Sequence, residues 1–256
     1  MEFTPYHINR WNGLISSELS NQDLEPEKLA VLGETIVNKP NRMVRRIDLE
    51  GTTVYAKWFA PSKSFLKRLF RKPLAFRLLE THKALLSAGI GCAEPLLAAI
   101  CDDPTRILPQ LFVYKEVPYP NISQRLKSAS TEEAMRIYDT AAKAIATLHK
   151  AGFVHGDCLP GNICLSDDNH AFFIDNDRTS RSFPFFRQRQ ECRNLIQFCA
   201  HAALQHGMSR EMQRQFLAHY FECSSQRMTT LDLLLDRIEV RRQEIQRQES
   251  NALQRK

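Results

Sequence analysis

The sequence predicts an α+β protein of two lobes, a small strand-rich N-terminal lobe and a helical C-terminal lobe, with a cleft between them. Short strand patterns and one helix fill the first part of the chain, and apolar residues at helical spacing dominate the second. We assign the N-lobe to residues 1–114, a hinge to 115–120 and the C-lobe to 121–256, all within a single domain. A chain of 256 residues is long enough for such a domain.

Two strands are expected in the N-lobe, over residues 42–49 and 52–59, with a short turn between them at Gly51. Apolar and polar residues alternate along the second of these strands, as they do when one face of a strand is buried. Lys57 should therefore project from one face of the sheet.

A helix is expected next, over residues 74–88, because leucines recur there at helical spacing and Gly89 follows as a terminator. Residues 108–114 then read as a strand, and the prolines at 118 and 120 mark the connection to the C-lobe.

The C-lobe begins with a helix that ends near Gly152. Ser130 and Glu133 have the spacing of a capping box at its start, and apolar residues mark one face. A short hairpin is expected over residues 163–165 and 171–174. Three further helices are expected at about 190–206, 210–222 and 229–250.

The chemistry concentrates in the loop 155–162 (HGDCLPGN) and in the run FFIDND that follows the hairpin. Phosphoryl transfer needs a positioned hydroxyl and metal ions that bridge the phosphates. Asp157 fits the residue that accepts the hydroxyl proton, and Asn162 follows it at the kinase spacing. Asn162 and Asp175, at a strand end, offer the hard oxygen ligands that Mg²⁺ prefers.

Two residues of the N-lobe complete the pattern. Lys57 lies in V-Y-A-K on a strand, as the lysine that holds ATP phosphates does, and Glu80 in the next helix is the expected partner that fixes it. His155 is expected to orient the loop through hydrogen bonds. Two interpretations of Asp177 are equally compatible with the sequence. It could contribute to binding the metal or the acceptor, or it could be an exposed acidic residue of the loop.

Each of these residues also has a purely structural interpretation. The H-G-D sequence could form a turn, Asn162 could cap a helix or turn, and Asp175 could simply end a strand. Lys57 could face the solvent from its strand, and Glu80 could be an ordinary surface residue. Their order and combination favour a phosphotransferase site. One part is missing, since no G-x-G-x-x-G precedes the lysine. If residues 33–43 cover the phosphates, they must use polar side chains such as Asn38, Lys39, Asn41 and Arg42.

These motifs resemble the lipopolysaccharide kinase family, which includes the core heptose kinases and the Kdo kinases and is similar in fold to protein kinases and aminoglycoside phosphotransferases. The matching pieces lie between about residues 44 and 195: VYAK, RLLETHKALLSAGI, HGDCLPGN, FFIDNDR and RQRQECRNL. Cys158, Leu159 and Asn176 depart from the residues usual in the family, which leaves the acceptor sugar open.

The resemblance implies a two-lobed protein-kinase-like fold that uses ATP and Mg²⁺. It implies a heptose or Kdo hydroxyl of the lipopolysaccharide inner core as the acceptor, on a lipid in the cytoplasmic leaflet. By position the resemblance implies that Asp157 is the catalytic base and that Lys57 binds the ATP phosphates. It also implies that Asn162 and Asp175 bind the metal and that Glu80 pairs with Lys57.

The charge balance favours an anionic partner, with a net charge of +6 and a pI of about 9.0. Residues 61–77 carry six basic residues, no acidic one and interleaved apolar residues, which suits either an anionic membrane surface or a solvated connector. Each such cation contributes roughly 1 kcal/mol at a membrane. No recognition motif accompanies the charge, so nucleic-acid binding is not expected.

The cysteines and apolar runs place the chain in the cytoplasm, at the inner face of the membrane if residues 61–77 touch it. The seven cysteines form no C-x-x-C pair and are expected to be reduced, without a zinc site. We expect neither a secretory signal nor a membrane span. The sequence does not determine the oligomeric state.

Three other functions are considered. An aminoglycoside- or choline-type phosphotransferase shares the loop, but its pocket for a cationic acceptor should be acidic. A protein kinase needs a longer segment after Asp175 and an A-P-E motif, which the sequence lacks. An inactive kinase-like scaffold is disfavoured because the catalytic residue types are intact.

Overall fold

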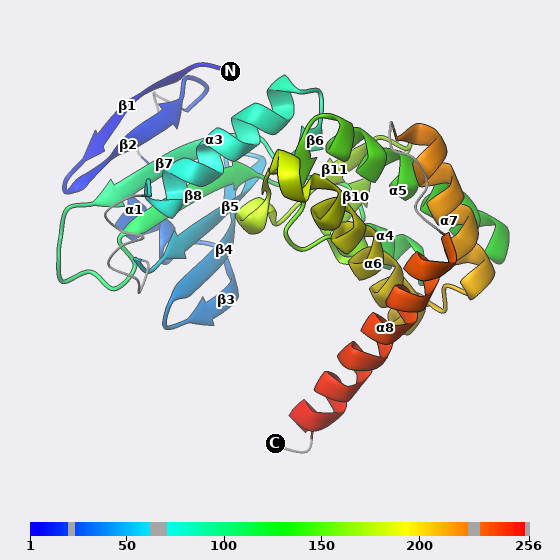
Figure 1. Ribbon diagram of the computed structural model, residues 1–256. Helices are drawn as coiled ribbons and strands as arrows, with labels where there is room; N and C mark the ends of the chain where they lie inside the picture. The colour runs from blue at the N-terminus through cyan, green and yellow to red at the C-terminus, as the bar shows by residue number, and fades with distance from the viewer. Residues whose placement is uncertain (20–23, 62–70, 225–230, 254–256) are drawn as a thin grey trace. The chain divides into compact units, whose positions relative to one another are not determined.

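The structure is a computed structural model that describes residues 1–19, 24–61, 71–224 and 231–253. The chain divides into two compact units, Met1–Val117 and Pro118–Lys256 (Figure 1). The boundary after Val117 lies inside the segment 115–120, and the hinge itself stays a prediction.

A seven-stranded antiparallel sheet forms the first unit, in the order β1-β2-β7-β8-β5-β4-β3. Its strands are β1 (Phe3–Ile8), β2 (Trp11–Ser16), β3 (Glu34–Lys39), β4 (Arg42–Leu49), β5 (Thr52–Phe59), β7 (Pro95–Cys101) and β8 (Gln110–Lys115). The two-residue strand β6 (Gly91–Cys92) precedes β7. Hairpins link β1 to β2, β3 to β4, β4 to β5 and β7 to β8, so most of the pairing is local in sequence.

The strands predicted at 42–49 and 52–59 are confirmed as β4 and β5, and the strand predicted at 108–114 is β8, two residues later at its start. Strands β1, β2, β3 and β7 were not predicted from the sequence. Strand β7 has no alternation to detect, because its first five residues are all buried.

The helix α3 (Leu74–Ser87) covers one face of this sheet and packs on β7 and β8. The predicted helix is thus confirmed to within one residue. Leu78 and Leu79 of α3 form a buried cluster with Ala98 of β7 and Phe112 of β8. Strand residues one position away point to the opposite face.

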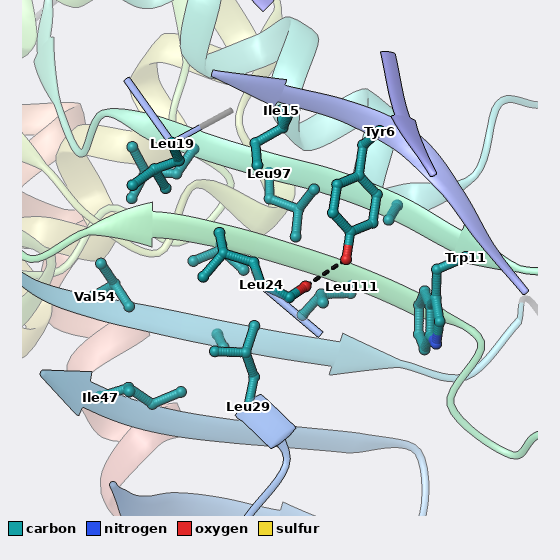
Figure 2. Packing of buried hydrophobic residues seen from close by; sticks show 14 of the residues in the cluster. Tyr6, Trp11, Ile15, Leu19, Leu24, Leu29, Ile47, Val54, Leu97 and Leu111 are labelled. Carbon is teal, nitrogen blue, oxygen red and sulfur yellow. Dashed lines mark hydrogen bonds between the residues drawn. The ribbon is translucent and has the colours of Figure 1, made fainter. Parts of the chain in front are cut away.

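The opposite face carries the larger core, to which the short helix α1 (Pro26–Leu29) contributes Leu29 (Figure 2). Trp11, Leu97 and Leu111 meet there, and the hydroxyl of Tyr6 donates a hydrogen bond to the carbonyl of Leu24, as Figure 2 shows. The two cores cover the central strands on both faces of the sheet. The packing therefore determines towards which core each side chain of β5 points.

Helices dominate the second unit: α4 (Ile122–Arg125), α5 (Thr131–Lys150), α6 (Arg187–His206), α7 (Arg210–Cys223) and α8 (Leu231–Leu253). The predicted helices are confirmed, with ends that differ by up to three residues. The hydroxyl of Ser130 accepts a hydrogen bond from the backbone N–H of Glu133 at 3.2 Å at the start of α5. Helix α5 packs on α7, and α6 packs on α8.

Short elements of this unit carry the chemistry. Strand β9 (Phe153–Val154) pairs with β12 (Ser180–Arg181), and β10 (Ile163–Leu165) forms the predicted hairpin with β11 (Ala171–Phe173). Three short 3₁₀ turns join them: η1 (Pro160–Asn162), η2 (Asn176–Arg178) and η3 (Pro184–Phe186). Among the described helices, none is both long and apolar enough to span a bilayer. All seven cysteines are free thiols.

Candidate active site

The loop 155–162 is anchored by His155, whose side chain is buried. Its Nε2 lies 3.0 Å from the carbonyl oxygen of Ile174, and its Nδ1 lies 3.2 Å from the backbone nitrogen of Asp157. Since a carbonyl only accepts and a backbone N–H only donates, Nε2 carries the proton and the ring is neutral. Burial also lowers the pKa of His155. The ring therefore ties the loop to the end of β11, which is the orienting role predicted for it.

A buried amide on α6 holds the same loop from the other side. Asn194 accepts hydrogen bonds from the His155 backbone N–H (3.0 Å) and from Nε2 of His149 (3.0 Å), and it donates to the His155 carbonyl (2.6 Å). Nδ1 of His149 in turn accepts a bond of 2.8 Å from the Tyr220 hydroxyl. Burial lowers the pKa of His149 to about 4, so this ring is also neutral near pH 7.

The glycine of the H-G-D sequence is needed for close packing. A Cβ on Gly156 would lie 2.2 Å from the Cβ of Arg178 in η2, a separation that atoms do not reach without a shift. The loop therefore packs directly on the turn that follows Asp175. This contact is a physical reason for glycine at position 156.

Asp157 projects from this anchored loop and is partly exposed. The amide Nε2 of Gln197 on α6 donates a hydrogen bond of 2.7 Å to its Oδ1. Within the described part of the chain, this is the one side-chain hydrogen bond to the carboxylate. Gln197 thus fixes one carboxylate oxygen, and Oδ2 is the atom suited to accept a proton.

Asn162 and Asp175 lie at the junction of the loop and the hairpin. Nδ2 of Asn162 donates to the Asp157 carbonyl (2.8 Å), and the Asn162 carbonyl accepts from the Ile174 backbone N–H (3.0 Å). Asp175 follows Ile174 directly with φ 54° and ψ 50°, a left-handed conformation that is uncommon outside glycine. The structure therefore brings Asp157, Asn162 and Asp175 together around one turn.

The donor set at this turn fits Mg²⁺. Because the amide nitrogen of Asn162 is bound to the Asp157 carbonyl, its Oδ1 is the end left for a ligand. Oxygen ligands of an Asn and an Asp suit a hard cation that keeps waters and takes phosphate oxygens. Among the described residues no group of three His, Cys, Asp or Glu side chains could hold a metal, so phosphate and water would supply the remaining ligands.

Lys57 lies on β5 opposite Phe112 of β8, on the sheet face that α3 covers. The residue is only 4% exposed, and its Nζ lies 5.3 Å from the ring centroid of Tyr114. A buried position therefore replaces the solvent-facing alternative. The polar residue that α3 buries against this aromatic pair is His82, whose ring centroid lies 5.1 Å from that of Phe112 and 6.0 Å from that of Tyr114.

Glu80 has a different environment on the same helix. Its side chain is 55% exposed and forms an ion pair with Lys72. The pairing of Glu80 with Lys57 stays a prediction, and the structure gives Glu80 this other partner.

The segment before Lys57 has no glycine-rich loop in its sequence, and in the structure it forms the β3–β4 hairpin. Residues 38–42 form the end of the β3–β4 hairpin. Gly33 precedes it with φ 66°, and a Cβ there would lie 2.1 Å from the carbonyl oxygen of Arg46. The lone glycine thus serves packing against β4, which leaves polar side chains of the hairpin as candidates for phosphate contacts.

The comparisons with known proteins bear on the same residues. The model of the lipopolysaccharide kinase (Kdo/WaaP) family matches residues 57–220, well over half of the chain. The chain belongs to this family. A solved structure described as WaaP in complex with acyl carrier protein is similar, with a TM-score of 0.62 at 19% identity, over 86% of this chain and 92% of that chain. A search of curated proteins found no match.

The predicted family and fold class are thereby confirmed: the chain is an α+β protein with the fold of the WaaP kinase. Because the chain belongs to the lipopolysaccharide kinase family, it is a phosphotransferase. The Kdo/WaaP match begins at Lys57 and ends at Tyr220, so it includes every predicted site residue and excludes α8. The acceptor and the individual catalytic roles are taken up below as proposals.

Two residues of this site were not found from the sequence. Asn194 lies in the stretch RQRQECRNL that resembles the family, but no role was predicted for it, and no role was predicted for Gln197. Both are polar positions three apart on α6, and Asn194 is buried there among apolar residues, which was the available signal. Asn176, noted as a departure from the family, is buried and bridges the Phe173 carbonyl (2.8 Å) and the Thr179 hydroxyl (2.9 Å). It therefore supports the turn behind Asp175.

Proposed function

We propose that this chain transfers the γ-phosphoryl group of ATP to a heptose or Kdo hydroxyl in the lipopolysaccharide inner core, with Asp157 as the base. The observation that carries the proposal is the fixed Asp157 carboxylate. Gln197 holds one oxygen at 2.7 Å, while His155 and Asn162 bind the backbone on either side of it. A carboxylate held in this way is pre-organised for one acceptor hydroxyl.

In the proposed reaction, the acceptor hydroxyl donates a hydrogen bond to Asp157. Its oxygen forms a bond to the γ-phosphorus as the bond from that phosphorus to the ADP oxygen breaks, and the hydroxyl proton passes to Asp157. Asn162 and Asp175 would hold Mg²⁺, which neutralises charge on the phosphates when bound. Lys57, which is buried on β5, would hold the phosphates, since a lysine ammonium is a compact point charge suited to them.

We propose a membrane-facing position for the second unit, based on three exposed phenylalanines. Phe183, Phe185 and Phe186 are 67%, 95% and 58% exposed, and we call residues 183–186 the phenylalanine segment. Large exposed aromatic side chains in a cluster mark an interaction surface, and Arg181 and Arg187 flank this one. Aromatic and basic residues together suit the interface of an anionic bilayer.

Residues 61–77, for which the sequence suits either a membrane contact or a solvated connector, lie largely outside the described residues, which omit 62–70. The phenylalanine segment is a separate candidate. It lies between the turn at Asp175 and α6 in the sequence, which suits delivery of a lipid-linked acceptor to the same unit that carries Asp157.

The direct test incubates the protein with labelled ATP and defined core oligosaccharides and locates the phosphate by mass spectrometry. The proposal expects a phosphate ester on a heptose or Kdo, and its absence in Asp157→Asn. Transfer to an aminoglycoside or choline in place of the core sugar would support the alternative enzyme class. No transfer to any acceptor by the wild type would support the inactive scaffold.

A further inference from the structure

A groove of about 530 Å³ lies between α6 and α8 in the second unit. Four arginines line it, and the remaining lining residues include two aliphatic side chains, an amide and one carboxylate. We call this the arginine groove; its residues are Arg189, Arg193, Ile196, Gln197, Arg237, Val240, Arg241 and Glu244.

The arginine groove adjoins the proposed base. Gln197 lines the groove and also donates the 2.7 Å hydrogen bond to Asp157. One turn further along α6, the pKa of His201 is lowered mainly by burial, further lowered by Arg241, and raised by Asp157. Both charges thus act on one ring, which is consistent with the short span from the groove to the carboxylate.

The positive charge of the groove is largely uncompensated. Arg189, Arg193 and Arg237 have no ion pair with any residue that the structure describes, and Arg241 is paired with Glu244 at 2.9 Å. Four cations therefore face one carboxylate. Gathering like charges is unfavourable unless an anion is bound between them.

Other arginines of the same unit do find acidic partners on the protein surface. They form the pairs Arg210–Asp236 at 2.8 Å, Arg214–Asp232 at 2.9 Å and Arg242–Glu239 at 2.7 Å. The groove thus brings together three arginines that have no ion pair with any described residue. Guanidinium groups bind carboxylates and phosphates through two parallel hydrogen bonds, which gives both orientation and affinity.

We infer that the arginine groove binds an anionic group of the acceptor saccharide, a carboxylate or a phosphate, and thereby holds the acceptor hydroxyl at Asp157. This rests on the proposed function, because it takes the acceptor to be phosphorylated at Asp157. Helix α8, which supplies Arg237 and Arg241, lies beyond the family match at residues 57–220. The half of the groove that α8 supplies therefore lies outside the family match, and the half on α6 lies inside it.

Binding tests this inference separately from catalysis. Isothermal titration would compare a defined inner-core oligosaccharide with the same oligosaccharide after carboxyl reduction and after phosphate removal. The proteins would be the wild type, Asp157→Asn, the double variant Arg193→Gln with Arg237→Gln, and Arg247→Gln as the control. Arg247 is exposed on α8 and does not line the groove. Thermal unfolding would check that each variant folds.

The double variant should bind the intact oligosaccharide about 10- to 100-fold more weakly, since each lost bond involves two charged groups. Arg247→Gln should bind it like the wild type, and Asp157→Asn, whose amide oxygen still accepts the hydrogen bond of the acceptor hydroxyl, should weaken binding far less than the double variant does. Weakening that follows carboxyl reduction identifies the carboxylate as the ligand, and weakening that follows phosphate removal identifies the phosphate.

Two results would overturn the inference: equal binding by the folded double variant and the wild type, or equal wild-type binding of the intact and the fully neutralised oligosaccharide. Arginine-dependent binding without any phosphoryl transfer would instead uphold the groove as a saccharide site and contradict the proposed function. The two failures are thus distinguishable.

Discussion

Replacing Asn194 by leucine removes the amide that anchors the catalytic loop while it keeps a similar volume. Three buried groups then lose their partner: the His155 N–H, the His155 carbonyl and Nε2–H of His149. An unsatisfied buried polar group costs about 1–3 kcal/mol, and coupled groups do not add fully. We expect the free energy of unfolding to fall by about 3–5 kcal/mol.

The assay is urea unfolding of the full chain, followed by intrinsic fluorescence, together with ATP turnover on the surviving folded protein. Gln205→Leu is the matched control, because Gln205 is exposed on the same helix. It should change the free energy of unfolding by less than about 0.5 kcal/mol. An Asn194→Leu protein within about 1 kcal/mol of the wild type would refute the claim that this network fixes the loop.

Three further predictions concern pH, the base and the membrane. Burial holds the pKa of His149 at about 4 in the folded chain, against about 6.5 unfolded, so the unfolded chain binds more protons between these values. The free energy of unfolding should fall by on the order of 3 kcal/mol from pH 6.5 to 4, and His149→Gln should flatten that decline. Gln197→Met should lower kcat about tenfold, through loss of a charge-assisted hydrogen bond, and leave KM for ATP unchanged. Phe185→Ser should weaken binding to anionic vesicles about tenfold, because a large exposed ring no longer enters the interface.

Each of these has its own control. Urea midpoints that fall equally in wild type and His149→Gln would show that other groups set the pH dependence. Gln205→Met places the same side chain elsewhere on α6, and a matching loss of kcat there would deny Gln197 a special role. Ile107 is 73% exposed in the first unit, so Ile107→Ser should leave vesicle binding intact. An equal loss in that variant would contradict the membrane role of the phenylalanine segment.

The parts of the site that follow one another in sequence could be predicted from it. Phosphoryl transfer requires an Asp and an Asn at a fixed spacing in one loop and a second Asp at a strand end, and those requirements are visible as residue types. Local geometry is visible in the same way. The turn at Gly51 and the alternation along β5 gave both strands their observed limits.

The parts that depend on distant segments could not be predicted. Gln197 reaches Asp157 across 40 positions of the chain, and Asn194 reaches His155 across 39. The sequence shows a polar residue on a helix, and only the packing of α6 on the loop decides what that residue contacts.

The arginine groove illustrates the same limit for charge. Arg189 and Arg193 come from α6, whereas Arg237 and Arg241 come from α8, so no basic run marks them in the sequence. The composition predicted an anionic partner, and residues 61–77 were a candidate contact because their six basic residues lie close together in the sequence. The fold brings a second set of basic residues, which are far apart in the sequence, together in the arginine groove.

The most direct measurement is single-turnover transfer of labelled phosphate to a defined inner-core oligosaccharide by the wild type and Asp157→Asn, at saturating ATP and Mg²⁺. With Asp157 as the base, the variant should bind the oligosaccharide normally and transfer phosphate at least 100-fold more slowly, the usual size of a general-base contribution. Transfer by a folded Asp157→Asn protein within about threefold of the wild-type rate would contradict the role of Asp157 in the proposed reaction.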